Sequence, residues 1–103
     1  MFNYLLKIEY NGKNFVGWQS QKNGRSIQDE IEKVLKKILK SKIKVIGAGR
    51  TDKGVHAFGQ YACFKYEKKI ENKERFLGSI NFFLNKNLIS IINIKPKKKY
   101  FHA

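Results

Sequence analysis

An apolar stripe at helical spacing in the first half of the chain leaves few folds open. Apolar side chains recur there every three or four positions, and lysines occupy the opposite face. The stripe consists of Ile27, Ile31, Val34, Leu35, Ile38 and Leu39. This spacing predicts an amphipathic helix that buries one face against other elements. Ser26, followed by Asp29, supplies a capping-box-like start for this helix.

Alternating apolar and polar residues predict strands on both sides of this helix. In the first strand the alternating apolar residues are Phe2, Tyr4, Leu6, Ile8 and Tyr10. Asn11-Gly12 ends that strand with turn chemistry, and the polar segment up to Arg25 is predicted to be a loop. Three later segments are predicted as a strand over 42–46, a loop over 47–54 and a strand over 58–66.

A second helix and a last strand complete the pattern. Asn72 is placed to cap the helix, whose apolar stripe is Phe76, Leu77, Ile80, Phe83 and Leu84. The last strand covers residues 88–94, and we expect Pro96 and the lysines 97–99 to stop it. The order βαββαβ predicts an α+β, ferredoxin-like fold, with an antiparallel sheet and both helices on one face. A chain of 103 residues suffices for one small domain and not two.

Charge points to an anionic partner. The chain carries 22 Lys and Arg against 8 Asp and Glu, a formal net charge of +14. A field of that sign favours polyanions, and nucleic acid is the expected one because neutralised phosphates release counterions. AT-rich coding is an alternative explanation, since Lys, Asn, Ile and Phe are all abundant. Most of the basic residues are Lys, which suits a diffuse field better than shaped contacts.

Several classes of protein are disfavoured by the sequence. Cys63 is the only cysteine, which excludes an internal disulfide. Because His56 and His102 are the only histidines, we expect no bound metal. No apolar run approaches the roughly 20 residues of a membrane helix, and the N-terminus lacks the features of a signal peptide. We therefore expect a reduced, cytoplasmic protein without a membrane segment.

The run from Gly49 to Ala57, Gly-Arg-Thr-Asp-Lys-Gly-Val-His-Ala, is the most informative for function. It brings a carboxylate, a guanidinium, an ammonium and an imidazole into one glycine-bracketed segment. An Asp in such a loop is usually a turn former, bonded to nearby backbone N–H groups. Here Arg50 and Lys53 flank Asp52, and adjacent cations hold a carboxylate ionised, as a nucleophile or base requires. These neighbours favour a chemical role for Asp52.

For other residues of the run, a structural role is an alternative to a functional one. Arg50 either pairs with Asp52 or acts as a planar cation that stacks on or slides between bases. His56 is either an acid or base or, more commonly, a strand-edge histidine with a satisfied hydrogen bond, so we assign it no catalytic role. Gly47 and Gly49 are too few for a dinucleotide fingerprint and do not open a helix.

The segment 10–19 contains aromatic, glycine and amide residues in a predicted loop. A packed Ω-loop with Trp18 as its plug is the simpler interpretation. The alternative is a nucleic-acid contact surface, for which the candidate contacts are Lys13, Trp18, Gln19 and Arg25.

The order βαββαβ is also that of the RRM module, which binds RNA without catalysis. Its third-strand signature is a basic residue and a glycine followed by exposed aromatics. Lys53-Gly54 fits the opening, but Val55, His56 and Ala57 stand where stacking aromatics are needed. An RRM-like RNA-binding module is therefore the alternative hypothesis.

Three blocks, in matching order and spacing, resemble the N-terminal part of the tRNA pseudouridine synthase A (TruA) family. They are Tyr10-Asn11-Gly12 with Phe15, Gly17, Trp18 and Gln19; Arg25-Ser26-Ile27-Gln28; and Ala48 to Ala57 with Gly59 and Gln60. The family usually has Asp at position 11 and Ala or Lys at position 53. Asn81 to Leu84 and Phe101-His102-Ala103 fit as well, so the resemblance covers essentially the whole chain.

The resemblance implies an isomerase that converts uridine to pseudouridine in the tRNA anticodon stem-loop, at tRNA positions 38–40. The N1–C1′ bond is cut, the base turns and C5 joins C1′. No atoms are gained or lost, so no cofactor is implied. Asp52 matches the catalytic aspartate, and Arg50 matches the arginine that helps displace the target nucleotide, since the base must leave the stack. Lys53 and His56 are expected to bind RNA beside them.

Family members are longer, with two similar halves and a homodimeric assembly. The resemblance therefore implies that residues 1–103 form a single N-terminal, RNA-binding and catalytic half-domain, and that the C-terminal half is absent. We expect the 103-residue chain to fold and bind RNA weakly, with little or no activity.

Overall fold

The computed structural model describes residues 1–10, 26–47 and 57–97. Two helices and four strands follow one another in the order predicted from the sequence, which confirms the α+β, ferredoxin-like fold. The elements are β1 (Phe2–Tyr10), α1 (Ile27–Leu39), β2 (Val45–Gly47), β3 (Ala57–Tyr66), α2 (Lys73–Leu84), the 3₁₀ turn η2 (Asn85–Asn87) and β4 (Ile89–Lys97).

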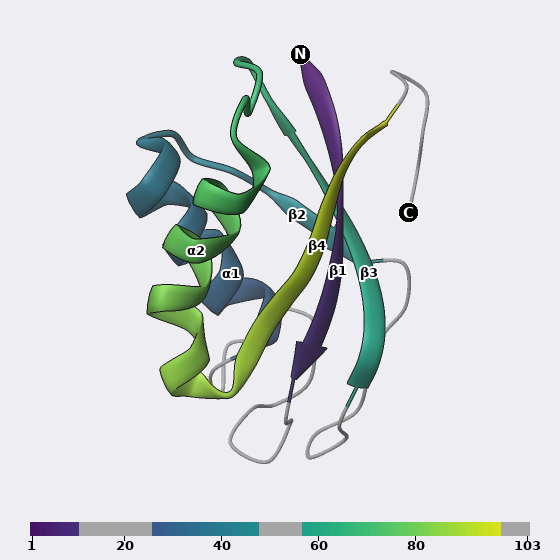
Figure 1. The fold of residues 1–103 in the computed structure, drawn as a ribbon, viewed down its shortest axis with the longest axis vertical. Coiled ribbons are helices and arrows are strands. Elements are labelled where there is room, and N and C mark those ends of the chain that lie inside the picture. Colours follow the sequence, from purple (N-terminus) through teal and green to yellow (C-terminus); the bar gives the residue numbers. More distant parts are fainter. Residues whose placement is uncertain (11–25, 48–56, 98–103) are drawn as a thin grey trace.

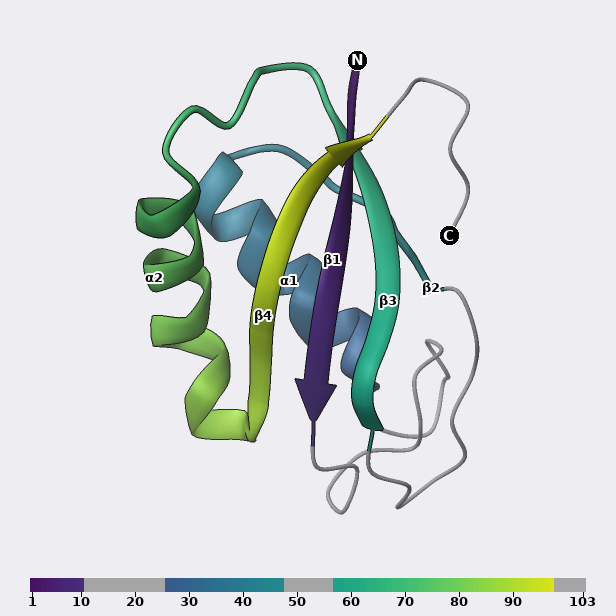
Figure 2. The same ribbon diagram turned by 45° about the vertical axis from the view of Figure 1, so that its right-hand side comes forward.

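The four strands form one sheet in the order β2-β3-β1-β4, and every neighbouring pair is antiparallel. The central strand β1 pairs with β3 from Phe2 opposite Tyr66 to Tyr10 opposite Ala57. Both helices lie against the same face of the sheet, and no helix of the described ranges covers the other face, which we call the open face (Figures 1 and 2). The sheet thus has one covered face, one open face and two edge strands, β2 and β4.

Both helices begin where the sequence places a cap. The Ser26 hydroxyl accepts a hydrogen bond from the backbone N–H of Asp29 at 3.0 Å. The Asn72 side chain accepts one from the backbone N–H of Arg75, also at 3.0 Å. Each bond satisfies one of the N–H groups that an α-helix leaves unpaired in its first turn. Lys40, with φ of 55°, ends α1 in the left-handed region.

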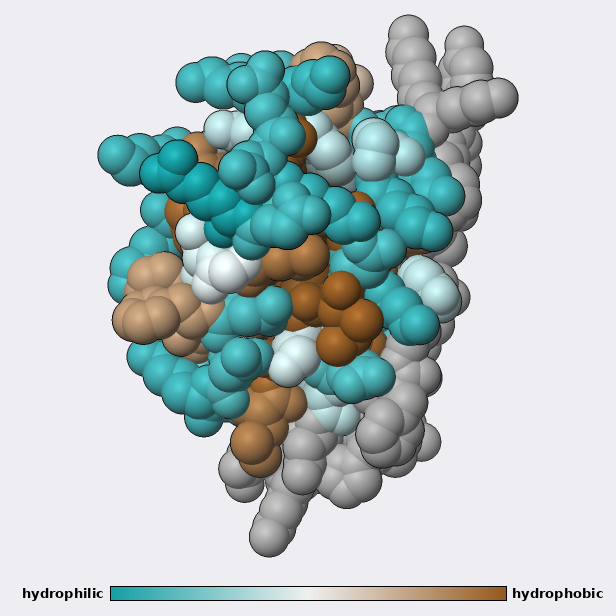
Figure 3. Space-filling model, viewed as in Figure 1, coloured by the Kyte–Doolittle hydropathy of each residue, from teal (hydrophilic) through white to brown (hydrophobic). Residues whose placement is uncertain are grey.

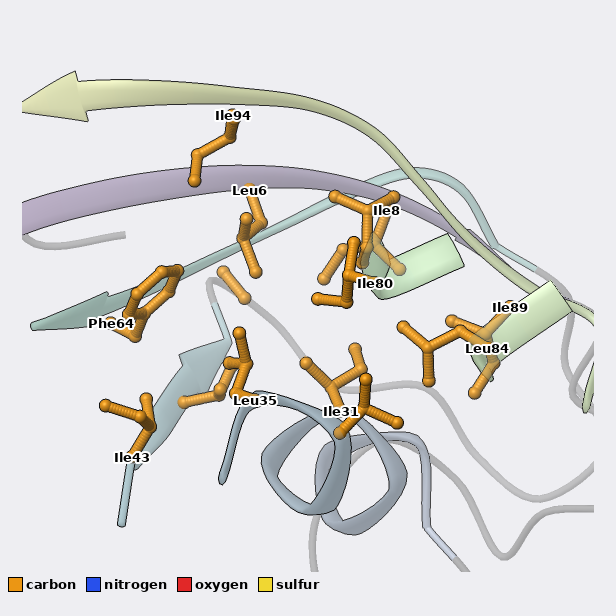
Figure 4. Close-up of a cluster of buried hydrophobic side chains, with 14 of the residues drawn as sticks. Leu6, Ile8, Ile31, Leu35, Ile43, Phe64, Ile80, Leu84, Ile89 and Ile94 are labelled. Carbon is orange, nitrogen blue, oxygen red and sulfur yellow. The ribbon is translucent and has the colours of Figure 1, made fainter. Parts of the chain in front are cut away.

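The core lies between the covered face of the sheet and the two helices (Figure 4). Fully buried members come from all these layers: Leu6 and Ile8 of β1, Ile31 and Leu35 of α1, Ile80 and Leu84 of α2, and Ile89 of β4. Each such side chain contributes about 1.5–3 kcal/mol through removal of apolar surface from water. The apolar stripes read from the sequence are therefore the faces that the helices bury.

Strand β4 departs from its predicted bounds. We expected Pro96 to stop it, but β4 continues to Lys97, with Pro96 opposite Tyr4. That expectation was wrong because β4 is an edge strand, where a residue without an N–H is tolerated. A bulge at Ile92 also separates the pairs Lys7–Asn93 and Ile8–Ile91.

Strand β2 is shorter than predicted. It covers three residues, Val45–Gly47, where the sequence pattern suggested a strand over 42–46. Strand β3 starts at Ala57, one residue before its predicted start. Its faces are as expected, since Ala62, Phe64 and Tyr66 are buried while Tyr61 is exposed.

Large apolar side chains also reach the surface in places. In the view of Figure 3, hydrophobic patches over the β4 and α2 side are interrupted by hydrophilic side chains. Exposed apolar residues of these elements include Phe82, which is 78% exposed, and Ile92, which is 44% exposed. No helix within the described ranges is long and apolar enough to cross a membrane.

Candidate functional site

The candidate site residues taken from the sequence lie outside the described residues. Four belong to the glycine-bracketed run and four to the preceding loop: Arg50, Asp52, Lys53 and His56, and Lys13, Trp18, Gln19 and Arg25. Their roles stay predictions. The described residues define the points from which these two segments start.

Both segments attach to the same end of the sheet. Segment 11–25 follows Tyr10, the last residue of β1, and segment 48–56 precedes Ala57, the first residue of β3. Tyr10 and Ala57 are directly paired in the β1–β3 ladder. The fold therefore joins two blocks that are far apart in sequence to neighbouring backbone positions.

Segment 48–56 has its other attachment at β2, which α1 holds through two side chains. Glu32 Oε2 accepts a hydrogen bond from the backbone N–H of Val45 at 2.8 Å. Gln28 Nε2 donates to the carbonyl oxygen of Val45 at 3.0 Å and to Glu32 Oε2 at 3.2 Å. We call this arrangement the β2 clamp. Gln28 and Glu32 are four residues apart and therefore share one face of the helix.

A related contact holds the opposite edge of the sheet. Asn81 of α2 donates from Nδ2 to the carbonyl oxygen of Ile91 at 3.0 Å. Its Oδ1 accepts a hydrogen bond from the Ile91 backbone N–H at 2.8 Å. We call this arrangement the β4 clamp. One amide side chain thus satisfies both backbone groups of a residue in β4.

The open face of the sheet carries a strong excess of positive charge. Alternation along the strands places on it Lys7, Lys65, Lys95 and Lys97. Glu9 is the only acidic residue of the described strands. The six other acidic residues of the described ranges lie in α1, in α2 or between β3 and α2, where lysines accompany them.

Two hollows mark the open face. The first has a volume of about 350 Å³ and is lined by Leu5, Lys7, Tyr61, Asn93, Lys95 and Lys97. The second has a volume of about 370 Å³, and its lining includes Asn3, Lys42, Lys44, Ile46, Cys63 and Lys65. Each hollow combines three ammonium groups with apolar or amide surface. We call them the β4-side hollow and the β2-side hollow.

This surface suits a polyanion better than it suits catalysis. Ammonium groups bind phosphates as point charges, and Tyr61, 43% exposed, offers an aromatic ring among them. Within the described part of the chain, no group of three or more His, Cys, Asp or Glu side chains could hold a metal ion. The open face can therefore hold a phosphate backbone.

Comparison with known proteins identifies the family. A family model described as tRNA pseudouridine synthase matches residues 7–103. The chain belongs to the tRNA pseudouridine synthase family. It is 52% identical, over its whole length, to a protein named tRNA pseudouridine synthase A from Pelagibacter ubique. It is 45% identical over 99% of its length to the protein of that name from Thermodesulfovibrio yellowstonii, and 42% identical over its whole length to the one from Aquifex aeolicus.

The relatives are considerably longer than this chain. The chain spans 42% of the Pelagibacter ubique and Aquifex aeolicus proteins and 39% of the Thermodesulfovibrio yellowstonii protein. The match to the family confirms the resemblance carried by the sequence blocks, and it extends through every described element after the start of β1.

Sequence reasoning missed four features of the described residues: the two clamps and the two hollows. Gln28 and Asn81 had been singled out only as parts of blocks that resemble the family. The available signal was a polar residue within an otherwise apolar helical stretch, as with Asn81 beside Ile80 and Phe82. The lysines of the open face were counted in the net charge, but their gathering on one face depends on strand pairing.

Proposed function

We propose that this chain is the N-terminal, RNA-binding and catalytic part of a tRNA pseudouridine synthase that isomerises uridine in the anticodon stem-loop, with positions 38–40 as targets. The observation that carries the proposal is the run Gly49 to Ala57, with Asp52 between Arg50 and Lys53, in a chain that belongs to this family. Residues 1–103 act in it as one half-domain of a longer enzyme, which works as a cytoplasmic homodimer.

In this proposal Asp52 is the catalytic residue and Arg50 helps to displace the target nucleotide. The neighbouring cations keep the carboxylate of Asp52 ionised, which both a nucleophile and a base need. The target base has to leave the stack before its N1–C1′ bond can be cut, and a guanidinium can take its place against the neighbouring bases. Because the reaction only moves a bond within the uridine, it requires no redox cofactor.

The RNA backbone runs over the open face of the sheet. Two observations support this part of the proposal: the lysines of the strands gather on that face, and the acidic residues are concentrated elsewhere. Binding through phosphates and shape, without base readout, fits an enzyme that acts within a folded RNA. Lys13, Trp18, Gln19, Arg25, Lys53 and His56 extend the contact from the loops that follow β1 and precede β3.

Tyr61 is the one described aromatic that lines the lysine-rich β4-side hollow. An unpaired base stacked on such a ring gains about 1–3 kcal/mol. Tyr61→Ala should therefore weaken the binding of an anticodon stem-loop RNA by roughly tenfold, while Tyr61→Phe should retain most of the affinity. Equal affinities of both variants and the wild type would remove Tyr61 from the binding surface.

The alternative is an RRM-like module that binds RNA without catalysis. An Asp52→Ala variant separates RNA binding from catalysis. Both hypotheses predict an unchanged RNA affinity for it, and only the proposed function predicts a loss of pseudouridine formation. We expect it to bind the stem-loop RNA like the wild type and to form no pseudouridine, as measured by nucleoside chromatography after digestion. Formation of pseudouridine by the variant would exclude the proposed role of Asp52. Its absence from every product, including the wild-type product, would favour the alternative.

The relatives are more than twice as long, so the protein for this test joins the chain to the remainder of the Pelagibacter ubique relative, of which it covers 42%. We call it the joined protein. The 103-residue chain alone is expected to bind RNA weakly and to form little or no pseudouridine.

A further inference from the structure

Val45 lies in an edge strand of the described sheet, and both of its backbone groups are satisfied. Among the described strands, β2 pairs with β3 alone, through the pairs Val45–Phe64, Ile46–Cys63 and Gly47–Ala62. In an antiparallel strand the N–H and C=O of one residue point to the same side. Since the N–H of Val45 donates to Glu32, both of its groups point away from β3. The β2 clamp occupies the place that a further strand would take.

The clamp is more than a cover for an exposed edge. Three residues give β2 very few hydrogen bonds to β3, so its position depends strongly on other contacts. The Glu32 carboxylate accepts two hydrogen bonds on one oxygen, from Val45 and from Gln28. Charge-assisted bonds of this kind are shorter and stronger than neutral ones. The 2.8 Å bond to Val45 therefore fixes β2 to a specific turn of α1.

The clamp has a functional consequence because of the segment that follows β2. Two residues after Val45 the strand ends at Gly47, and segment 48–56 with Asp52 begins. The far end of that segment is held by the long β1–β3 ladder at Ala57. The near end follows β2, which the described residues hold through the clamp, through three pairs with β3 and through the buried side chain of Val45. Catalytic groups have to be placed within a fraction of an ångström, and a displacement of about 1 Å costs about 100-fold in rate.

We propose that Gln28 and Glu32 are positioning residues for the reaction, acting through Val45 on the segment that carries Asp52. This inference rests on the proposed function, in which Asp52 is the catalytic residue. It assigns a role to two side chains that do not lie on the open face and are not expected to touch the RNA. Loss of the clamp should lower kcat and leave KM nearly unchanged.

The first test observes the clamp itself in the 103-residue chain by NMR. In the wild type, the amide hydrogen of Val45 should exchange slowly although β2 is an edge strand. In Glu32→Ala it should exchange at least tenfold faster, and the amide resonances of residues 48–56 should shift. Equal exchange rates in both proteins, or unchanged resonances in 48–56, would overturn the proposal whether or not the protein is an isomerase.

Two variants of the clamp distinguish geometry from charge. Glu32→Gln keeps an oxygen that can accept from Val45, so it should retain most of the protection and most of the activity. Gln28→Glu replaces the Nε2 donor by a second carboxylate, which would lie against the Glu32 carboxylate and the carbonyl oxygen of Val45, so it should be worse than Gln28→Ala. The matched control is Glu67→Ala, which removes the same charge from an exposed position after β3.

The functional test uses the joined protein and an anticodon stem-loop substrate. Glu32→Ala should lower kcat by about tenfold, a smaller loss than full misplacement would cause, with KM within about twofold. Glu67→Ala should leave both constants unchanged. A wild-type protein without activity would refute the proposed function. The NMR result would then show whether the clamp acts on segment 48–56. An active wild type with an equally active Glu32→Ala variant would overturn the positioning role.

Discussion

The two edges of the sheet are held by the same kind of contact but differ in what they need from it. At each edge, helix side chains satisfy the backbone N–H and C=O of one strand residue: Ile91 in β4 and Val45 in β2. Strand β4 has nine residues, eight of them paired with β1, whereas β2 has three residues paired with β3. The β4 clamp therefore adds to a long strand pairing, whereas the β2 clamp supports a short one together with the buried side chain of Val45.

The difference suggests that one edge of the sheet bears mainly on stability and the other on activity. The β4 edge, with α2 packed below it, contributes mainly to the stability of the fold. The β2 edge lies next to the segment that carries the candidate catalytic residue, so the same contact there bears on activity. Substitutions at the two edges should separate these roles, and the following predictions are ordered by the expected change in the free energy of unfolding.

The largest loss is expected in the core below the β4 edge. Ile80 of α2 is fully buried, and Ile80→Ala should lower the free energy of unfolding by about 2–5 kcal/mol because it removes apolar contacts and leaves a cavity. Urea denaturation of the 103-residue chain measures the loss. Phe82→Ala, two residues along at an exposed position, is the control and should cost no more than about 1.5 kcal/mol, the contribution of its edge-on ring contact with Phe83.

The β4 clamp comes next. Asn81→Ala leaves the partly buried N–H and C=O of Ile91 without their partner, which should cost about 1–3 kcal/mol in urea denaturation. The kcat of the folded joined protein should stay within about twofold of the wild type, because β4 leads into neither candidate segment. A large drop in kcat at unchanged stability would break the distinction between the two edges.

A smaller loss is expected at the start of the helix that carries the β2 clamp. Ser26 is fully buried and caps α1, so Ser26→Ala should lower the free energy of unfolding by about 1 kcal/mol. Asn72→Ala removes the corresponding cap of α2 at an exposed position, and it should cost no more than Ser26→Ala. A larger effect at Asn72 than at Ser26 would show that burial does not govern the two caps.

The smallest stability change is expected on the open face, although the effect on binding there is large. Replacing Lys7 and Lys95 together by Gln should alter the free energy of unfolding by less than about 0.5 kcal/mol. It should weaken RNA binding and reduce the slope of log affinity against log salt by about 2, one unit for each phosphate contact. The control replaces Lys33 and Lys36 of α1, both exposed on the helix layer, by Gln. Equal losses from both pairs would mean that RNA binds through net charge alone.

The sequence predicted the elements of this fold well because their signals are local. The apolar stripe of α1, the caps at Ser26 and Asn72 and the alternation in β1 each need only neighbouring residues to be recognised. The predicted end of β4 was wrong because a strand tolerates Pro96 only where β4 lies at an edge. That position is a property of the assembled sheet.

The candidate site was predictable only as far as its motifs reach. The run around Asp52 is a compact signature, and it indicated the family that the comparison then confirmed. The contacts of Gln28 and Glu32 with Val45 join residues 17 and 13 positions apart and follow no local rule. The gathering of lysines on one face likewise follows from strand order, because Lys7, Lys65 and Lys95 lie on three different strands.

The most direct test of the account is the release of tritium from an anticodon stem-loop RNA labelled at uridine C5, catalysed by the joined protein. Forming the C5–C1′ bond expels the hydrogen at C5, so each isomerisation event releases one label to water. We predict release by the wild type and none above background by Asp52→Ala, with equal RNA affinity for both. Release by the Asp52→Ala variant at the wild-type rate would contradict the account, because the residue at its centre would then have no part in the chemistry.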